Sequence, residues 1–231
     1  IPLLVSQLAK ENYEIRCVLS KNAEKLIKPL SLSILSRNPC ILENDQWSNS
    51  QTTPLHIELG NWADILIIAP LTATTLAKWV TGNADGLIPS ILIANNKPII
   101  VAPAMNTKMW LNHAVQQNYL NLKKYRNVLS LQPSKGVLAC DEIGIGKLPP
   151  NDLIQLAIDF IVSYKQKPFC KDLINQEFLI TGGCTTEKID IARNITNNSS
   201  GTMGLLLAQV ARFRGAKYLT ALLMLGIMDS I

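Results

Sequence analysis

Short, mostly apolar runs alternate along this chain with segments whose apolar residues return at helical spacing. Continuous apolar runs are typical of parallel strands buried on both faces. The strands predicted from these runs lie at 64–69, 97–102 and 128–131, and each stretch also contains one polar residue, Asp64, Lys97 or Ser130. Apolar residues three or four positions apart predict helices between and after these runs. The helices are expected at 76–80, 87–94, 107–124 and 151–160. Alternating strands and helices predict an α/β fold with a doubly wound parallel sheet.

The N-terminal residues predict the second half of a strand-helix-strand unit, and a long polar stretch follows further along. Helical spacing over residues 3–11 precedes an alternating, strand-like stretch at 13–19. A second helix is expected over 22–35, broken by Pro29, and the polar stretch 38–53 is typical of an exposed loop. Pro54 then starts a short helix that Gly60 and Asn61 are expected to end.

Four turn-forming residues, Pro133, Gly136, Gly144 and Gly146, make the stretch 132–148 look like a site loop and not a core element. A polar linker at 165–174 precedes a strand at 177–181, a helix at 205–214 and a strand at 218–223. We therefore expect a first domain over 1–164 and the start of a second α/β domain over 175–231. The helical spacing begins at Ile1 without a capped start, so we expect the gene product to continue at both ends.

Composition excludes several classes of protein. With 48% hydrophobic and 17% charged residues the chain is expected to be globular, and no apolar run reaches the roughly 18 residues of a membrane span. A net charge of +5 is spread without a dense basic run, which gives no support to nucleic-acid binding. Five cysteines without C-x-x-C spacing and only two histidines predict no metal cluster. Reduced thiols in the cytoplasm are the expected state.

Two strand ends carry candidate chemistry. The sequence PAMNTKMW at 103–110 follows a buried strand, where Asn106 offers an amide and Met105 and Met109 offer soft apolar surface. The alternative is a strand end whose Asn caps a helix and whose Met residues are core. Three threonines follow the preceding strand, and their hydroxyls at a helix N-terminus suit a phosphate or ribityl chain, or simply cap the helix. They are Thr72, Thr74 and Thr75.

Three separated motifs resemble one family. PAMNTKMW fits the P-x-M-N-x-x-M-W signature of flavin-dependent cysteine decarboxylases. His56 upstream, within HIELGNWAD, and ACDEIG at 139–144 downstream have the order and approximate spacing of the decarboxylase half of bifunctional phosphopantothenoylcysteine decarboxylase/phosphopantothenate–cysteine ligases. The segments 180–183 and 197–204 look like the start of the ligase half.

The resemblance implies FMN-dependent decarboxylation of 4′-phosphopantothenoyl-cysteine to 4′-phosphopantetheine in coenzyme A biosynthesis. It implies that His56, placed just before its helix, is the base in thiol oxidation, that Asn106 holds the substrate carboxylate beside Met109, and that Cys140 donates a proton. It further implies a homo-oligomer, a trimer or dodecamer. Flavin contacts are implied for Ser20, Thr72, Thr74, Thr75, Ala102 and Met105.

Two departures and two rival functions accompany this resemblance. The family's glycine- and serine-rich phosphate loop is not in the sequence, and SGTMG at 200–204 replaces the usual SGKMG. Asn197 matches a residue that acts on the acyl-cytidylate, but a ligase half needs Mg²⁺ and CTP sites beyond residue 231, so little ligase activity is expected. The rivals are a non-catalytic regulatory or assembly relative, and a CTP-using ligase module.

Overall fold

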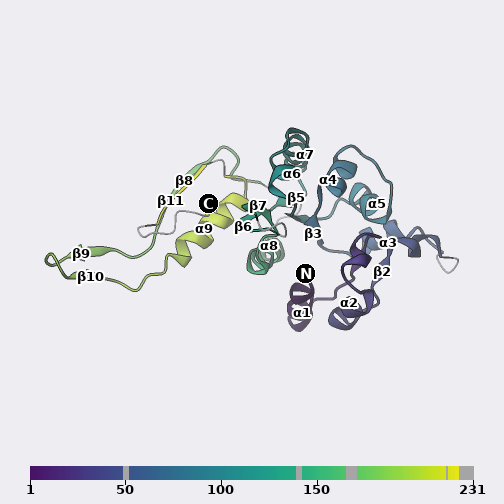
Figure 1. Ribbon diagram of the computed structural model, residues 1–231, viewed down its shortest axis with the longest axis horizontal. Coiled ribbons are helices and arrows are strands. Elements are labelled where there is room, and N and C mark those ends of the chain that lie inside the picture. Colours follow the sequence, from purple (N-terminus) through teal and green to yellow (C-terminus); the bar gives the residue numbers. More distant parts are fainter. Residues whose placement is uncertain (49–51, 139–141, 165–170, 217, 224–231) are drawn as a thin grey trace. The chain divides into compact units, whose positions relative to one another are not determined.

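The computed structural model describes residues 1–48, 52–138, 142–164 and 171–216, and the backbone of 218–223 (Figure 1). The chain divides into two compact units, Ile1–Asp159 and Phe160–Ile231. Each is described by itself below.

A three-stranded parallel sheet forms the centre of the first unit. Its strands, in the order β3 (Leu66–Leu71), β4 (Ile99–Pro103) and β5 (Val128–Ser130), are connected through helices. The helices are α4 (Ala73–Val80), α5 (Leu87–Ala94), α6 (Thr107–Trp110) and α7 (His113–Lys123). Every residue of β4 is buried, as the unbroken apolar run predicts for a central parallel strand. The α/β class and the parallel sheet are therefore confirmed.

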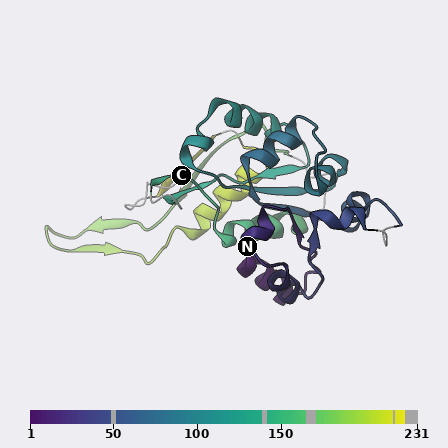
Figure 2. The same cartoon turned by 45° about the vertical axis from the view of Figure 1, so that its right-hand side comes forward.

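The main core lies between this sheet and the helices α4, α6 and α7 (Figure 2). Alternate residues of β4, Ile99 and Val101, enter this cluster, and Trp110 meets Tyr119 edge to face with ring centroids 4.9 Å apart. The buried Tyr119 hydroxyl donates to the Leu131 carbonyl at 2.8 Å, so its polar end is satisfied. At roughly 25 cal/mol per Å² of apolar surface, such side chains supply most of the stabilisation.

The N-terminal part is more structured than its polar residues indicate. It contains α1 (Pro2–Lys10), β1 (Val18–Leu19), η1 (Ala23–Lys25), α2 (Pro29–Ser36), β2 (Ile41–Leu42), η2 (Glu43–Trp47) and α3 (Leu55–Trp62). β1 and β2 form a separate parallel pair. The prediction of a plain loop at 38–53 was wrong because its acidic side chains satisfy backbone groups. Asp45 accepts from Leu42 N at 2.7 Å, and Glu43 from Leu87 N at 2.6 Å.

Three further boundaries differ from prediction. Gly60 and Asn61 do not end α3, because α3 continues to Trp62. The expected helix 107–124 is split into α6 and α7, since Asn112 Oδ1 accepts from Ala114 N at 3.0 Å and starts a new helix. The stretch 132–148 contains the antiparallel pair β6 (Ser134–Val137) and β7 (Ile143–Lys147) instead of a loop alone. Its glycines are positions of close packing, as described below.

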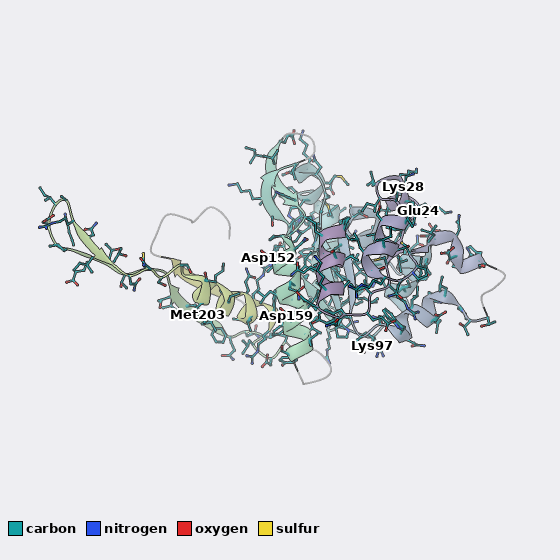
Figure 3. All side chains as sticks on the ribbon, turned by 90° about the horizontal axis from the view of Figure 1, so that it is seen from below. Glu24, Lys28, Lys97, Asp152, Asp159 and Met203 are labelled. Carbon is teal, nitrogen blue, oxygen red and sulfur yellow. The ribbon has the colours of Figure 1, made fainter. Side chains whose placement is uncertain are left out.

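Helix α8 (Asn151–Ser163) follows this hairpin and is amphipathic. Ile154, Ala157 and Ile158 are buried, whereas Asp152 and Asp159, seven residues apart, lie on its exposed face (Figure 3). Two turns of an α-helix separate residues seven apart, so the acidic pair shares one side.

The second unit contains a parallel strand pair joined by a helix. β8 (Glu177–Gly182) pairs with β11 (Tyr218–Leu223), and α9 (Thr202–Phe213) packs on β8. The helix approaches closely because Gly182 faces Gly204, where an added Cβ on either glycine would lie near 3 Å from the other's Cα. The hairpin of β9 (Thr186–Lys188) and β10 (Asn194–Thr196) was not predicted, and its residues are exposed (Figure 1).

Candidate active site at the carboxyl ends of β3 and β4

The loops that follow β3 and β4 lie at the same edge of the parallel sheet. Leu71 and Pro103, the last residues of the two strands, are register partners, and Ala104 N donates to Leu71 O at 3.2 Å. Thr72, which follows β3, and Asn106, which follows β4, therefore belong to loops at the same edge of the sheet. Open α/β sheets place their ligands at this edge.

The threonine loop after β3 starts helix α4. Thr72 is the N-cap, and its Oγ1 accepts from Thr75 N at 3.3 Å and lies 3.2 Å from Thr75 Oγ1. The side chains of Thr72 and Thr74 are exposed. One hydroxyl therefore caps the helix, and two more stand beside the positive end of an eight-residue helix, an arrangement suited to an anion.

The asparagine loop after β4 starts helix α6. Asn106 Oδ1 accepts from Lys108 N at 2.8 Å, so the capping role predicted as the alternative is present. Met105 packs against the main core, whereas Met109 is 49% exposed. Capping uses the Oδ1 acceptor of the Asn106 amide, whereas binding a carboxylate uses the NH₂ donor. The two roles are compatible in one side chain.

The β6–β7 hairpin is held against the asparagine loop through two glycines. Met105 N donates to Gly146 O at 2.9 Å, and a Cβ on Gly146 would overlap the Met105 carbonyl oxygen. A Cβ on Gly144 would overlap the Thr107 hydroxyl, which is buried and has no hydrogen-bond partner among the described residues. The sequence pattern predicted both glycines as turn residues. Their spacing of two places them on one face of a strand, and this spacing could have indicated that another segment packs closely there.

Charge adds a weaker link between the hairpin and this loop. Lys108 Nζ lies 3.8 Å from Glu142 Oε1, and both side chains are half or more exposed, so the pair contributes little to stability. Leu138 N donates to Glu142 O at 3.0 Å. Cys140, the predicted proton donor, lies between Leu138 and Glu142 in the sequence and is outside the described part of the chain.

The remaining predicted residues lie on other elements. His56 is the second residue of α3, which Pro54 N-caps, so the expectation that His56 precedes the first turn was wrong. Its side chain is partly exposed. Ser20 directly follows β1, and its Oγ accepts from Ala23 N at 3.3 Å. Ala102 is fully buried in β4. His56 and Ser20 thus lie on α3 and directly after β1, apart in the sequence from the asparagine loop.

Asn197 lies in the second unit, in the exposed segment after β10. Its Nδ2 donates to Thr185 Oγ1 at 3.3 Å and its Oδ1 accepts from Ser199 N at 3.3 Å. Thr185 and Asn197 line a shallow depression of about 500 Å³ together with residues of β9 and β10.

The described residues contain no group of three or more His, Cys, Asp or Glu side chains that could hold a metal ion. No helix in the part that the structure describes is long and apolar enough to cross a membrane.

Comparisons with known proteins match two successive parts of the chain. Residues 1–163 match the family model described as Flavoprotein, and residues 173–223 match that of the DNA/pantothenate metabolism flavoprotein C-terminal domain. The chain is 35% identical over 214 residues to the coenzyme A biosynthesis bifunctional protein CoaBC of Borreliella burgdorferi and 35% identical over 216 residues to that of Escherichia coli. These alignments cover 93% of the chain but 53% and 51% of the relatives, so the chain spans about half their length.

Solved structures with the same fold include a PPC decarboxylase mutant complexed with pantothenoylaminoethenethiol, at 34% identity and a TM-score of 0.62, covering 68% of this chain and 88% of that one. The FMN binding protein AtHal3 is also 34% identical, with a TM-score of 0.60, covering 70% of this chain and 88% of that one. Both agree with the Rossmann-like α/β fold described above.

Proposed function

Because the chain belongs to the flavoprotein family, we propose that it carries the FMN-dependent decarboxylase part of a coenzyme A biosynthesis protein, acting on 4′-phosphopantothenoyl-cysteine. The observation that carries this proposal is the shared edge of β3 and β4, where a threonine-capped helix end lies beside the Asn106 loop. Similarity to CoaBC proteins over 93% of the chain supports the choice of substrate.

The residues at this edge fit FMN. The ribityl and phosphate groups need hydroxyl and N–H donors, and Thr72, Thr74 and Thr75 offer both at the start of α4. Met105 supplies polarisable apolar surface just after β4, which ends at Pro103. Ala102, the residue before Pro103, is assigned a contact with the flavin through its backbone. Ser20, at the end of β1, completes the proposed set of cofactor contacts.

The substrate cysteine cannot lose carbon dioxide directly, because the electrons left on its α-carbon have no acceptor. Bound FMN would supply the redox chemistry, accepting a hydride from the thiol-bearing carbon and returning it after carbon dioxide has left. Three side chains of this chain serve the steps around it. We assign proton abstraction from the thiol to the His56 imidazole, carboxylate binding to the Asn106 amide beside Met109, and proton return to the Cys140 thiol.

A neutral amide suits the position of Asn106. It donates a hydrogen bond to the carboxylate and adds no positive charge that would stabilise the carboxylate against its loss. The cap to Lys108 N fixes the amide on the loop, so little reorganisation is needed when substrate binds.

The domain limits and the assembly state belong to the same proposal. We assign 1–164 to the decarboxylase, 165–174 to a linker and 175–231 to the start of a ligase domain, in which Asn197 acts on an acyl-cytidylate made with CTP and Mg²⁺. The decarboxylase is proposed to assemble as a trimer, alone or within a dodecamer, in the cytoplasm. Light scattering of the purified protein tests the assembly, since a monomer with full activity contradicts it.

The function is tested with the two histidines of the chain. His56→Asn removes the proposed base, and His113→Asn, on the exposed first position of α7, is the matched control. Full-length protein with bound flavin, absorbing near roughly 450 nm, should release carbon dioxide from 4′-phosphopantothenoyl-cysteine. We expect His56→Asn to keep the flavin and lose the activity, and His113→Asn to keep both. Flavin binding without carbon dioxide release in the unaltered protein would instead support the non-catalytic relative.

A further inference from the structure

Cys17 and Cys40 stand at matching positions on two paired strands. β1 and β2 are parallel, with Val18 opposite Ile41 and Leu19 opposite Leu42. Ile41 N donates to Cys17 O at 2.8 Å, so the pairing continues to the residues that precede the strands. One step back along both strands places Cys17 opposite Cys40.

The two thiols also share a face. Partners in register on neighbouring strands project to the same side of a sheet. Both cysteines pack against the same apolar cluster, built on Val5, Leu19 and Leu32. Neighbouring strands lie roughly 4.8 Å apart, which falls within the Cα separation of about 4.4–6.8 Å that a disulfide requires. Both residues are free cysteines of intermediate burial, so a small reagent can reach them.

The surroundings keep both groups protonated at neutral pH. Burial raises the pKa of the Cys17 thiol, with a hydrogen bond to Ser36 opposing the change. Burial also raises the pKa of Cys40, to about 11, and the negative charges of Cys17, Glu24 and Asp45 add to the effect. The influence of Cys17 on the pKa of Cys40 is expected of thiols that lie side by side. Since the thiolate is the nucleophile, their oxidation should be slow at neutral pH and faster as pH rises.

We propose that Cys17 and Cys40 are a redox-responsive dithiol that closes to an intramolecular disulfide in the presence of a disulfide oxidant such as oxidised glutathione. One cysteine thiolate attacks the oxidant's sulfur–sulfur bond and releases one glutathione thiolate. The second cysteine thiolate then attacks the mixed disulfide at the protein sulfur, forms the Cys17–Cys40 bond and releases the second glutathione. The two protons pass to the released thiolates, so two protein thiols are oxidised and one glutathione disulfide is reduced.

The bridge would join the two strands immediately before Val18 and Ile41, and would close a loop containing η1 and α2. Ser20 lies three residues after Cys17 on the same strand end. A disulfide at this place fixes the position of that strand end whether or not Ser20 contacts a flavin. The proposal therefore stands independently of the proposed function.

Mass spectrometry of the full chain tests the proposal without using activity. Reduced protein is incubated with oxidised glutathione at pH 8, remaining thiols are alkylated, and the protein is digested without reductant. We expect a linked peptide pair containing Cys17 and Cys40, lighter by two hydrogen atoms than the separate peptides, and its loss after treatment with dithiothreitol. The free thiol count should fall by two. When the protein is oxidised while unfolded in urea, the Cys17–Cys40 link should no longer form in preference to other cysteine pairs.

Three variants separate this link from general thiol oxidation. Cys184→Ser, a buried cysteine of the second unit, is the matched control and should keep the linked peptide. Cys17→Ser and Cys40→Ser should each lose it and show a glutathione adduct on the remaining thiol. Adducts on both cysteines of the unaltered protein without a link overturn the proposal, as does preferential pairing with Cys140, Cys170 or Cys184. The linked peptide is measured in the unaltered protein, so poor folding of a variant leaves that result intact.

Discussion

The two loops at the candidate site occupy equivalent positions but are fixed in different ways. The threonine loop after β3 is held by its own cap, in which Thr72 accepts from Thr75 N three residues away. The asparagine loop after β4 also has a local cap, from Asn106 to Lys108 N, but in addition the β7 strand packs on it through Gly144 and Gly146. One loop is thus determined locally, and the other depends on residues about forty positions further along the chain.

This difference indicates how the two loops can serve one site. A locally capped helix end needs no outside support to present hydroxyls and N–H groups to an anion. A residue that must hold a reacting carboxylate needs a fixed position, because small displacements of a reacting group cost large factors in rate. The β6–β7 hairpin, which encloses the segment with Cys140 in the sequence, supplies that support to Asn106. Changes in the two loops should therefore have different consequences.

The largest effect is expected from Gly146→Ala. The added methyl overlaps the Met105 carbonyl oxygen, which is backbone and cannot turn away, and Gly146 has φ of +152°. The strand must move and lose the bond from Met105 N, so we expect a loss of about 3 kcal/mol in unfolding free energy. Urea unfolding followed by tryptophan fluorescence measures it, since all four tryptophans lie in the first unit.

Gly60→Ala is the control for that substitution. Gly60 lies inside α3 with nothing within 4 Å of an added Cβ, so alanine should raise the unfolding free energy by about 0.5–1 kcal/mol. Equal effects of the two substitutions would show that β7 does not press on the asparagine loop.

Asn106→Asp should separate capping from carboxylate binding. Aspartate caps a helix as well as asparagine does, so the unfolding free energy should change by less than about 0.5 kcal/mol. Its charge repels the substrate carboxylate, and we expect decarboxylation to fall at least about a hundredfold. Asn112→Asp makes the same exchange at the cap of α7, where Oδ1 accepts from Ala114 N at 3.0 Å. Since both variants keep their caps, an activity loss as large in Asn112→Asp would mean that the effect does not come from repulsion of a carboxylate bound at Asn106.

The sequence predicted those parts of this site that local patterns determine. The apolar run 99–102 marked β4, and Asn106 after its end was a recognisable cap and a motif residue. The long-range packing was not predictable in the same way, because a glycine that permits close approach looks the same as a glycine in a turn. The hydrogen bond from Leu87 N to the Glu43 carboxylate, 44 residues away, was equally unpredictable, because Glu43 lies in a polar stretch that looked like a loop.

A smaller and purely local effect is expected from Thr72→Ala. Losing the cap of α4 should lower the unfolding free energy by about 1 kcal/mol. Thr74→Ala, an exposed position in the same turn, should change it by less than about 0.5 kcal/mol. FMN titration of both variants then tests the flavin contact, since both hydroxyls are assigned to the cofactor. If neither variant binds FMN more weakly, the threonines cap the helix and do nothing more.

The smallest effect concerns the Thr107 hydroxyl, which is buried against Gly144 and has no hydrogen-bond partner among the described residues. Valine has nearly the same shape without the hydroxyl, so Thr107→Val should leave the unfolding free energy unchanged or raise it by up to about 1 kcal/mol. Thr81→Val is the control with the opposite sign, because the Thr81 hydroxyl donates to Ala77 O at 2.9 Å and its loss should cost about 0.5–1 kcal/mol. A cost at Thr107 as large as at Thr81 would show that the hydroxyl is hydrogen-bonded in solution, and that the hairpin and the asparagine loop are joined by a polar contact as well as by the close packing of the glycines.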